Sequence, residues 1–181
     1  MKYKLTDVKI NFMGKTLFQI EAVKCFGDIV KGQKGGFIEK ESNLSQGGNA
    51  WVSGNAKVYG NAEVYGDAKV SGNAWVSGNA KVSGNAWVSG NAKVSGNAKV
   101  YGNAEVKGNA DYLVIGPIGS RNDITTFFKT ANNDIKVSCG CFTGTIEEFL
   151  EKVNETHGNN NYVKEYKTAV EIAKIHIFGG E

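Results

Sequence analysis

The stretch Trp51-Val52-Ser53-Gly54-Asn55-Ala56 is followed by Lys57-Val58-Tyr59-Gly60-Asn61-Ala62, and this six-residue unit continues with little change to Ala110. Valine recurs at every sixth position from Val52 to Val106, and an alanine stands four residues after each valine. A fixed period in a sequence indicates one structural unit that is stacked on itself. The repeat therefore predicts a rod as the central part of the molecule.

Strand geometry explains why one unit makes one side of a coil. Neighbouring side chains of a strand point to opposite faces, so in Lys57-Val58-Tyr59 the valine faces inward and its neighbours face outward. The Gly-Asn pair that follows favours a bend, because both residue types tolerate the left-handed backbone region. Three such units would close a triangular coil, and the next coil would stack on it at ~4.8 Å. The predicted core is a column of valines and alanines.

An aliphatic residue with a small residue four positions later, at a strict period of six, resembles the left-handed β-helix of hexapeptide-repeat proteins. The resemblance covers about a third of the chain and implies a mainly β fold built on a left-handed parallel β-helix. The run from Gly35 to Leu44, which leads into the Gly-Asn-Ala repeats, is also similar to hexapeptide-repeat proteins of phages and prophages. That similarity implies an accessory protein that counters bacterial immunity.

The remaining sequence divides into a cap at each end of the predicted β-helix, which spans residues 35–110. Residues 1–34 alternate like a β cap with a turn at Met13-Gly14. In the first irregular repeat, Ile38 is expected to point inward with Ser42 in the alanine place, and Leu44 starts the next repeat. Solenoids need such atypical ends, because an open end exposes core side chains and unpaired backbone.

Residues 111–181 have a different composition and predict a small α+β domain. Three strands are expected at residues 112–115, 124–129 and 135–141. Thr145-Ile146-Glu147-Glu148 is typical of a capping box and predicts the start of a helix that Gly158 ends. A second helix is expected from about Tyr162 to Ile175.

Composition narrows the possible partners. The net charge is +3, and the segments 1–50, 51–110 and 111–181 carry sums of +3, +3 and −3 without a basic run, which argues against nucleic-acid binding. No apolar run is long enough for a membrane span and no signal peptide precedes the first strand, so we expect a cytoplasmic protein of the bacterial host. Three cysteines without a disulfide-type spacing agree with this expectation.

The outward side chains form ladders, because residues eighteen apart should lie above one another. One ladder joins Trp51, Lys69 and Trp87, and another joins Lys57, Trp75 and Lys93. Alternating Trp and Lys permits cation–π stacking that stabilises the surface of the rod. Exposed tryptophans are equally typical of an interface with a host protein or with further copies, and the resemblance implies a trimer. The predicted interface residues are Trp51, Tyr65, Lys69, Trp75, Trp87 and Tyr101.

Two glycine-containing turns in the C-terminal segment are candidate anion sites. Gly119, Ser120 and Arg121 offer amides and a guanidinium after a strand, a pattern that also fits a plain tight loop with a surface arginine. Thr143, Gly144 and Thr145 place amides at a predicted helix N-terminus. If the strands pair as expected, the two turns would face or lie near each other.

Cys139, Cys141 and His157 are the weak candidates for a metal site or a Cys–His pair. Alternating cysteines of a strand are more often packing groups on one face, and His157 suits the last turn of a helix. No metal and no cofactor are therefore predicted, since a fourth ligand is missing.

These patterns favour a non-enzymatic binding protein that sequesters a small anionic, nucleotide-like ligand or occludes a host protein. The chain has no histidine before His157, so the base that hexapeptide acyltransferases use is missing from the coils. Two alternatives stay open: an acyltransferase that depends on His157 or His176, and a structural spindle or spike component.

Overall fold

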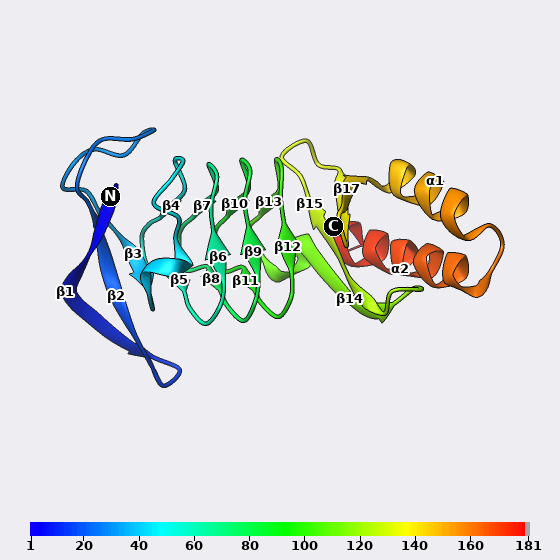
Figure 1. Cartoon of the computed structure of the whole chain (residues 1–181), viewed down its shortest axis with the longest axis horizontal. Coiled ribbons are helices and arrows are strands. Elements are labelled where there is room, and N and C mark those ends of the chain that lie inside the picture. Colours follow the sequence, from blue (N-terminus) through cyan, green and yellow to red (C-terminus); the bar gives the residue numbers. More distant parts are fainter. Residues whose placement is uncertain (180–181) are drawn as a thin grey trace.

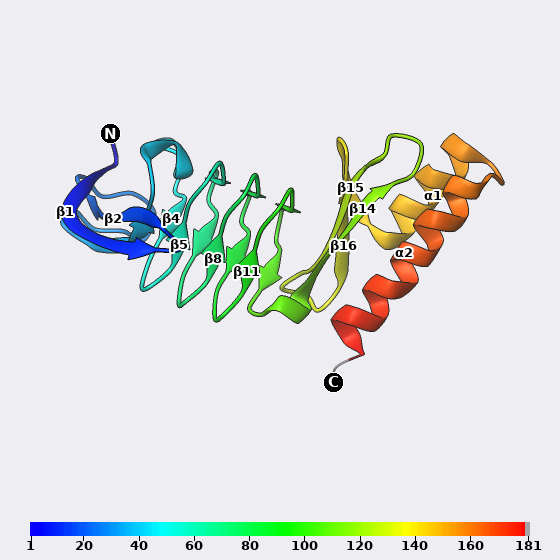
Figure 2. The same cartoon turned by 90° about the horizontal axis from the view of Figure 1, so that it is seen from below.

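The computed structural model describes residues 1–179 and is an elongated, mainly β rod (Figure 1). A hairpin covers one end of a β-solenoid of about four turns, and an antiparallel sheet with two helices covers the other end (Figure 2). The solenoid strands contain two residues each. They are β4 (Trp51–Val52), β5 (Lys57–Val58), β6 (Glu63–Val64), β7 (Lys69–Val70), β8 (Trp75–Val76), β9 (Lys81–Val82), β10 (Trp87–Val88), β11 (Lys93–Val94), β12 (Lys99–Val100) and β13 (Glu105–Val106).

The register of the solenoid follows the predicted period of eighteen residues. Every third strand pairs in parallel, so Trp51 lies beside Lys69 and Lys69 beside Trp87. Three sheets result, with β5-β8-β11 on one side, β4-β7-β10-β13 on the second and β6-β9-β12 on the third. The predicted ladders are therefore confirmed.

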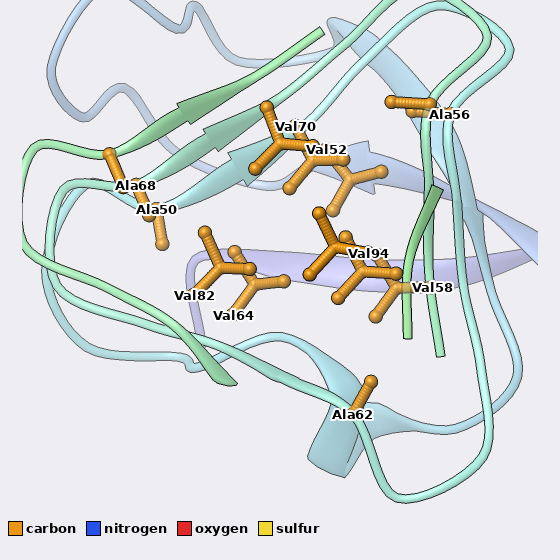
Figure 3. Packing of buried hydrophobic residues seen from close by; sticks show 14 of the residues in the cluster. Ala50, Val52, Ala56, Val58, Ala62, Val64, Ala68, Val70, Val82 and Val94 are labelled. Atoms are coloured by element: carbon orange, nitrogen blue, oxygen red, sulfur yellow. The ribbon is translucent and has the colours of Figure 1, made fainter. Parts of the chain in front are cut away.

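The core consists of the repeated valines and alanines. From Ala50 to Val106 none of these side chains is more than 2% exposed, and Figure 3 shows valines from all three sides converging on the axis. The repeat glycines from Gly54 to Gly102 have φ between 59° and 71°, a region that glycine enters without a Cβ penalty. Glycine thus makes the corner and valine fills the interior.

The backbone bonds between coils at the corners run in one direction, from an amide to a carbonyl of the following coil. Ser53 N donates to Val70 O at 2.8 Å, and Asn55 N donates to Gly72 O at 2.9 Å. A ladder with this direction ends in carbonyls without donors at the first coil and in amides without acceptors at the last coil. Donors of the N-terminal cap and acceptors of the C-terminal domain can pair with these groups, because buried backbone polar groups need partners.

The N-terminal cap is built from β1 (Tyr3–Phe12), β2 (Lys15–Ala22) and β3 (Lys34–Ile38), with the predicted turn at Met13-Gly14. The β3 strand continues the β5 side of the solenoid through the pair Ile38 and Val58, so the predicted inward position of Ile38 is confirmed. The cap supplies donors. Lys2 is 1% exposed, and its Nζ donates to the carbonyls of Gly47, Gly48 and Ala50 at 3.1, 3.2 and 2.8 Å.

The expected inward position of Ser42 was wrong. A 3-10 turn, η1 (Glu41–Asn43), exposes Ser42 and buries Asn43. The Asn43 Nδ2 donates to Gly60 O at 3.1 Å and to Ala62 O at 2.8 Å. Serine has no side-chain amide that could make these two bonds. Leu44 is buried and bridges to Val64, so the prediction for Leu44 is confirmed.

The C-terminal domain contains η2 (Asn109–Asp111), β14 (Tyr112–Ile118), β15 (Asp123–Lys129), β16 (Ile135–Cys139), β17 (Phe142–Thr145), α1 (Ile146–His157) and α2 (Asn161–Phe178). The strands form an antiparallel sheet in chain order. The two helices and the three predicted strands are confirmed with shifted bounds. The expected strand to Cys141 was wrong at its end, because Gly140 turns the chain with φ 60° and a fourth strand, β17, pairs back.

Adjacent residues of β15 belong to two different cores. Phe128 is fully buried in the valine and alanine core of the solenoid, whereas Phe127 packs with the helices. This end of the rod supplies acceptors. Lys93 N donates to Asn109 Oδ1 at 2.9 Å, and Lys99 N donates to Thr126 Oγ1 at 3.1 Å. The sheet is therefore the closing layer of the solenoid as well as one wall of the C-terminal domain.

Candidate functional site

The first predicted anion loop already holds a carboxylate of the same chain. Gly119 N donates to Glu165 Oε2 at 2.7 Å, and Ser120 is exposed beside it. An amide that is paired with a charged acceptor offers little to an external anion. Of the three residues in this loop, Arg121 remains as the group that can face a ligand.

The second predicted anion turn is occupied as well. The predicted capping box is confirmed, with Glu148 N donating to Thr145 Oγ1 at 3.2 Å and Thr145 N donating to Glu148 Oε2 at 2.8 Å. Thr143 and Gly144 lie in β17, where they pair with β16. The first amides of α1 are thus partly satisfied by the helix itself.

The two predicted turns do not form one site. Arg121 lies against Gly140, because a Cβ built on Gly140 would meet the Arg121 guanidinium at 3.1 Å. Gly140 lies in the turn before β17, and Thr145 is the last residue of β17. The helix α1 then runs back, which brings Thr156 and His157 of its last turn to the same pocket as Arg121.

This pocket, which we name the Arg121 pocket, is small and has a volume of about 110 Å³. Its walls come from the loop after β14, from the β16–β17 turn and from both helices. The lining residues are Arg121, Cys139, Phe142, Phe149, Lys152, Val153, Thr156, His157 and Tyr166.

The charges in the Arg121 pocket are positive. Arg121, Lys152 and His157 line it, and no acidic residue does. Lys152 has Glu155 as an exposed partner at 3.1 Å. Arg121 is the only arginine of the chain, and among residues 1–179 its guanidinium makes no ion pair or hydrogen bond.

Tyr166 supplies a hydroxyl to the pocket. It packs so closely on the β14–β15 loop that a Cβ on Gly119 would lie 1.9 Å from its Oη, so only glycine fits there. Its sole polar contact in the described chain is Cys139 Sγ at 4.0 Å, and Thr125 Oγ1 donates to the same sulfur at 3.3 Å. Burial, followed by the effect of Cys139, raises the pKa of Tyr166 to about 12, so the hydroxyl keeps its proton at neutral pH.

The cysteines and His157 are arranged differently from the prediction. Cys139 and Cys141 flank a turn instead of alternating along one strand, so Cys139 is half-buried and Cys141 is exposed. His157 stacks on Tyr166 with ring centroids 6.1 Å apart, in the last turn of α1 as expected. Within the described part of the chain, no three His, Cys, Asp or Glu side chains gather in a way that could hold a metal ion.

The tryptophans of the ladders have three different environments. Trp51 points out of the coil but is only 3% exposed, because Tyr3 and Phe26 of the N-terminal cap cover it. Its expected place in an exposed interface was therefore wrong. Trp75 is half-buried between Phe12 and the Lys93 ammonium, which lies 4.6 Å from the ring centroid.

The third outward face carries the predicted tyrosines. Ser83 is buried in the column between Tyr65 and Tyr101. Burial raises the pKa of Tyr101, and a hydrogen bond with Tyr65 raises it further. Lys81 Nζ lies 3.3 Å from Glu63 Oε2 on the same face and forms an opposite-charge pair with it. These contacts stabilise the surface of the rod.

Trp87 is 47% exposed and borders a groove between the β4-β7-β10-β13 face and the loop that follows β2. The groove has two depressions, of about 250 and 390 Å³, which share Asp28, Lys69 and Trp87. Asp28 of the loop forms an ion pair with Lys69. Asp28 could not be found from the sequence, because only the folded loop brings it to the ladder.

A comparison of the chain with protein-family profiles and with curated proteins finds no match. Among residues 1–179, neither helix combines the length and the apolar character that crossing a bilayer requires.

Proposed function

We propose that this chain is a non-enzymatic binding protein that captures a small anionic ligand through the Arg121 pocket. The observation that carries the proposal is the placement of the single arginine, without an internal partner, in a pocket whose lining contains no carboxylate. Unpaired guanidinium groups bind oxyanions well, because their planar N–H groups match two oxygens at once.

The other lining groups support an oxyanion. The Tyr166 hydroxyl keeps its proton and has one weak internal contact, so it can donate to an oxygen of the ligand. Lys152 adds positive charge to the lining, and the His157 ring adds a hydrogen-bonding group. Two aromatic residues, Phe142 and Phe149, form the apolar part of the wall and reduce the competition from water.

The size of the pocket limits what it can enclose. A water molecule takes ~30 Å³ of liquid volume, so about 110 Å³ corresponds to roughly three or four waters. A phosphate or carboxylate group fits this space, whereas a whole nucleotide does not. For a nucleotide-like ligand, the base and sugar would lie outside the pocket on the surface of the C-terminal domain.

Binding without chemistry is favoured by the surroundings of the thiol. Cys139 contacts Thr125 and Tyr166, and no described contact joins its sulfur to His157. Nucleophilic catalysis by a cysteine needs a base within hydrogen-bonding reach of the sulfur. We therefore assign Cys139 a packing role beside Tyr166.

The single arginine makes the test selective. In an NMR titration, its Nε–Hε group gives one side-chain resonance. We expect the chemical shift of this resonance to change in a saturable way with inorganic phosphate, AMP or a cyclic dinucleotide. Arg121→Gln should weaken binding at least about tenfold in calorimetry, because a hydrogen bond to a charged group contributes ~1.5–3 kcal/mol. Lys174→Gln, which removes an exposed charge of α2 outside the pocket, should leave the affinity unchanged.

Two results would reject the proposal. One is the absence of any shift of the Arg121 resonance with the whole panel. The other is equal binding by the wild type and Arg121→Gln. Acetyl-coenzyme A turnover that is lost in His157→Ala would instead favour the acyltransferase alternative.

The finer features expected from the sequence and its resemblances are part of the same proposal. They are a left-handed coil, membership of the hexapeptide-repeat proteins, a homotrimer in solution and an accessory role against host immunity in the bacterial cytoplasm. Occlusion of a host protein would use the exposed part of the ladders around Trp87. Light scattering tests the oligomeric state, and a monomer at micromolar concentration would contradict the trimer.

A further inference from the structure

The groove beside Trp87 is a second, independent place where the molecule can hold a ligand. It lies at the N-terminal end of the rod, where the loop after β2 runs alongside β4 (Figure 1), whereas the Arg121 pocket belongs to the opposite end. Both depressions of the groove lie near the lower bound of ~300 Å³ that is usual for small-molecule sites. Two depressions that share one tryptophan suit a ligand of two ring-sized units.

The indole of Trp87 forms a fixed apolar platform. Its Nε1 donates to Ser71 Oγ at 2.9 Å, which sets the orientation of the ring. Trp87 is 47% exposed and lines both depressions, so it is accessible to a ligand in the groove. An aromatic face carries negative quadrupole density and attracts the weakly positive C–H groups of a ring placed over it.

The charges of the groove disfavour an anionic ligand. Lys69 is paired with Asp28, and Asp67 adds a second carboxylate to the larger depression. The lining as a whole thus has two acids and one base, unlike that of the Arg121 pocket. A neutral ligand is the better fit, because an anion would face a net negative wall.

The walls also offer polar groups with unused hydrogen-bonding capacity. Along the two other corners of the solenoid, asparagine amides bond to each other eighteen residues apart, as in Asn55 and Asn73. Asn85 has Asp67 below it and makes no such bond among the described residues, so its amide is free to pair with a ligand. Asp67 Oδ1 accepts from Asn49, which leaves Oδ2 as an acceptor.

A buried group at the smaller depression points to the same conclusion. Trp51 lines it, and its Nε1 is buried without a hydrogen-bond partner in the described chain. Leaving a buried donor unpaired costs about as much as a lost hydrogen bond. An acceptor from a ligand in this depression that reached Nε1 would remove this cost.

We propose that the groove binds a neutral saccharide of two ring units, which stacks on Trp87 and bonds through its hydroxyls to Asn85 and Asp67. Hydroxyls both donate and accept, so they match a wall that presents carboxylates and amides together. The C–H face of a sugar ring matches the indole, and the absence of charge matches the net negative lining. No part of this proposal depends on anion binding at Arg121.

Saturation-transfer NMR tests the proposal with four disaccharides: cellobiose, maltose, lactose and diacetylchitobiose. A glycan array then extends the test to other saccharides. Trp87→Lys is the informative variant, because lysine occupies the same repeat position at Lys69, Lys81 and Lys93 and preserves the fold. We expect binding at least tenfold weaker in Trp87→Lys, partial recovery in Trp87→Phe, and weakening in Asn85→Ala. Lys93→Ala, on another face of the rod, should bind like the wild type.

Quenching of tryptophan fluorescence provides a second readout, since Trp87 is the most exposed of the three indoles. The proposal is overturned if no saccharide of the array binds more strongly to the wild type than to Trp87→Lys. It is also overturned if uncharged nucleosides bind at Trp87 and saccharides do not. Neither result would affect the Arg121 resonance, so the two proposals fail separately.

Discussion

Truncation of Phe128 to alanine should open the last coil of the solenoid and leave the helical domain folded. Phe128 is 0% exposed and fills the end of the valine and alanine core, whereas its neighbour Phe127 faces the helices. The two side chains point to opposite faces of β15, as neighbours in a strand must. One truncation therefore affects one core.

The size of the effect follows from the burial of the ring. Removing a buried phenylalanine costs ~3–5 kcal/mol, because the transfer energy of the ring is lost and a cavity remains. Two contacts hold the sheet in place at this end and hinder collapse of the cavity. They are the hydrogen bond from Lys99 N to Thr126 Oγ1 and the β-bridge between Ala104 and Thr130. We therefore expect about 4 kcal/mol at this end of the rod.

Hydrogen exchange measured by mass spectrometry separates local from global effects. Each ~1.4 kcal/mol changes an equilibrium tenfold, so 4 kcal/mol raises the exchange of amides in β12 and β13 by a factor of about 10³. The same amides should change much less in Phe127→Ala, which should instead accelerate exchange in α1 and α2. Unchanged exchange of β12 and β13 in Phe128→Ala, or equal acceleration of the helices, would refute the reasoning that β15 separates two cores.

Two further predictions concern the rod itself. Gly84→Ala should destabilise the protein by ~1–3 kcal/mol more than Gly96→Ala in urea unfolding. Both positions have similar positive φ, but only a Cβ at Gly84 would meet backbone, 2.8 Å from Gly102 N. Equal losses of stability would show that φ alone decides the effect. Burial lowers the pKa of Lys2 to about 8 from 10.5, so the folded chain releases this proton at lower pH than the unfolded chain. The stability of the wild type relative to Lys2→Met should therefore rise between pH 8 and 10, and a flat or falling difference in unfolding midpoints would contradict this assignment.

The repeat was predictable because its information is local and redundant. Each unit specifies the same strand and the same corner, and stacking of identical units fixes the register of Trp51 with Lys69 without further information. The capping box at Thr145 was equally readable, since its partners are three residues apart. These features need no knowledge of distant contacts.

The candidate sites were less predictable because they depend on contacts between distant segments. The cover over Trp51 comes from Phe26, and Asp28 reaches Lys69 across 41 residues of chain. Tyr166 is a core residue of α2, and nothing in its sequence position indicates that it also lines the Arg121 pocket. The amides of Gly119 and Thr145 looked available because the sequence does not indicate which carboxylates fold onto them.

The direction of the hydrogen-bond ladder explains why the two caps differ in chemistry. Carbonyls of the first coil receive the ammonium of Lys2 and the amide of Asn43, whereas amides of the last coils donate to Asn109, Thr126 and Asp111. The uniform repeat thus leaves corner carbonyls to be paired at its first coil and corner amides at its last coils, while other contacts run the opposite way, since Glu39 Oε2 accepts from Gly60 N and Ala131 N donates to Asn103 O.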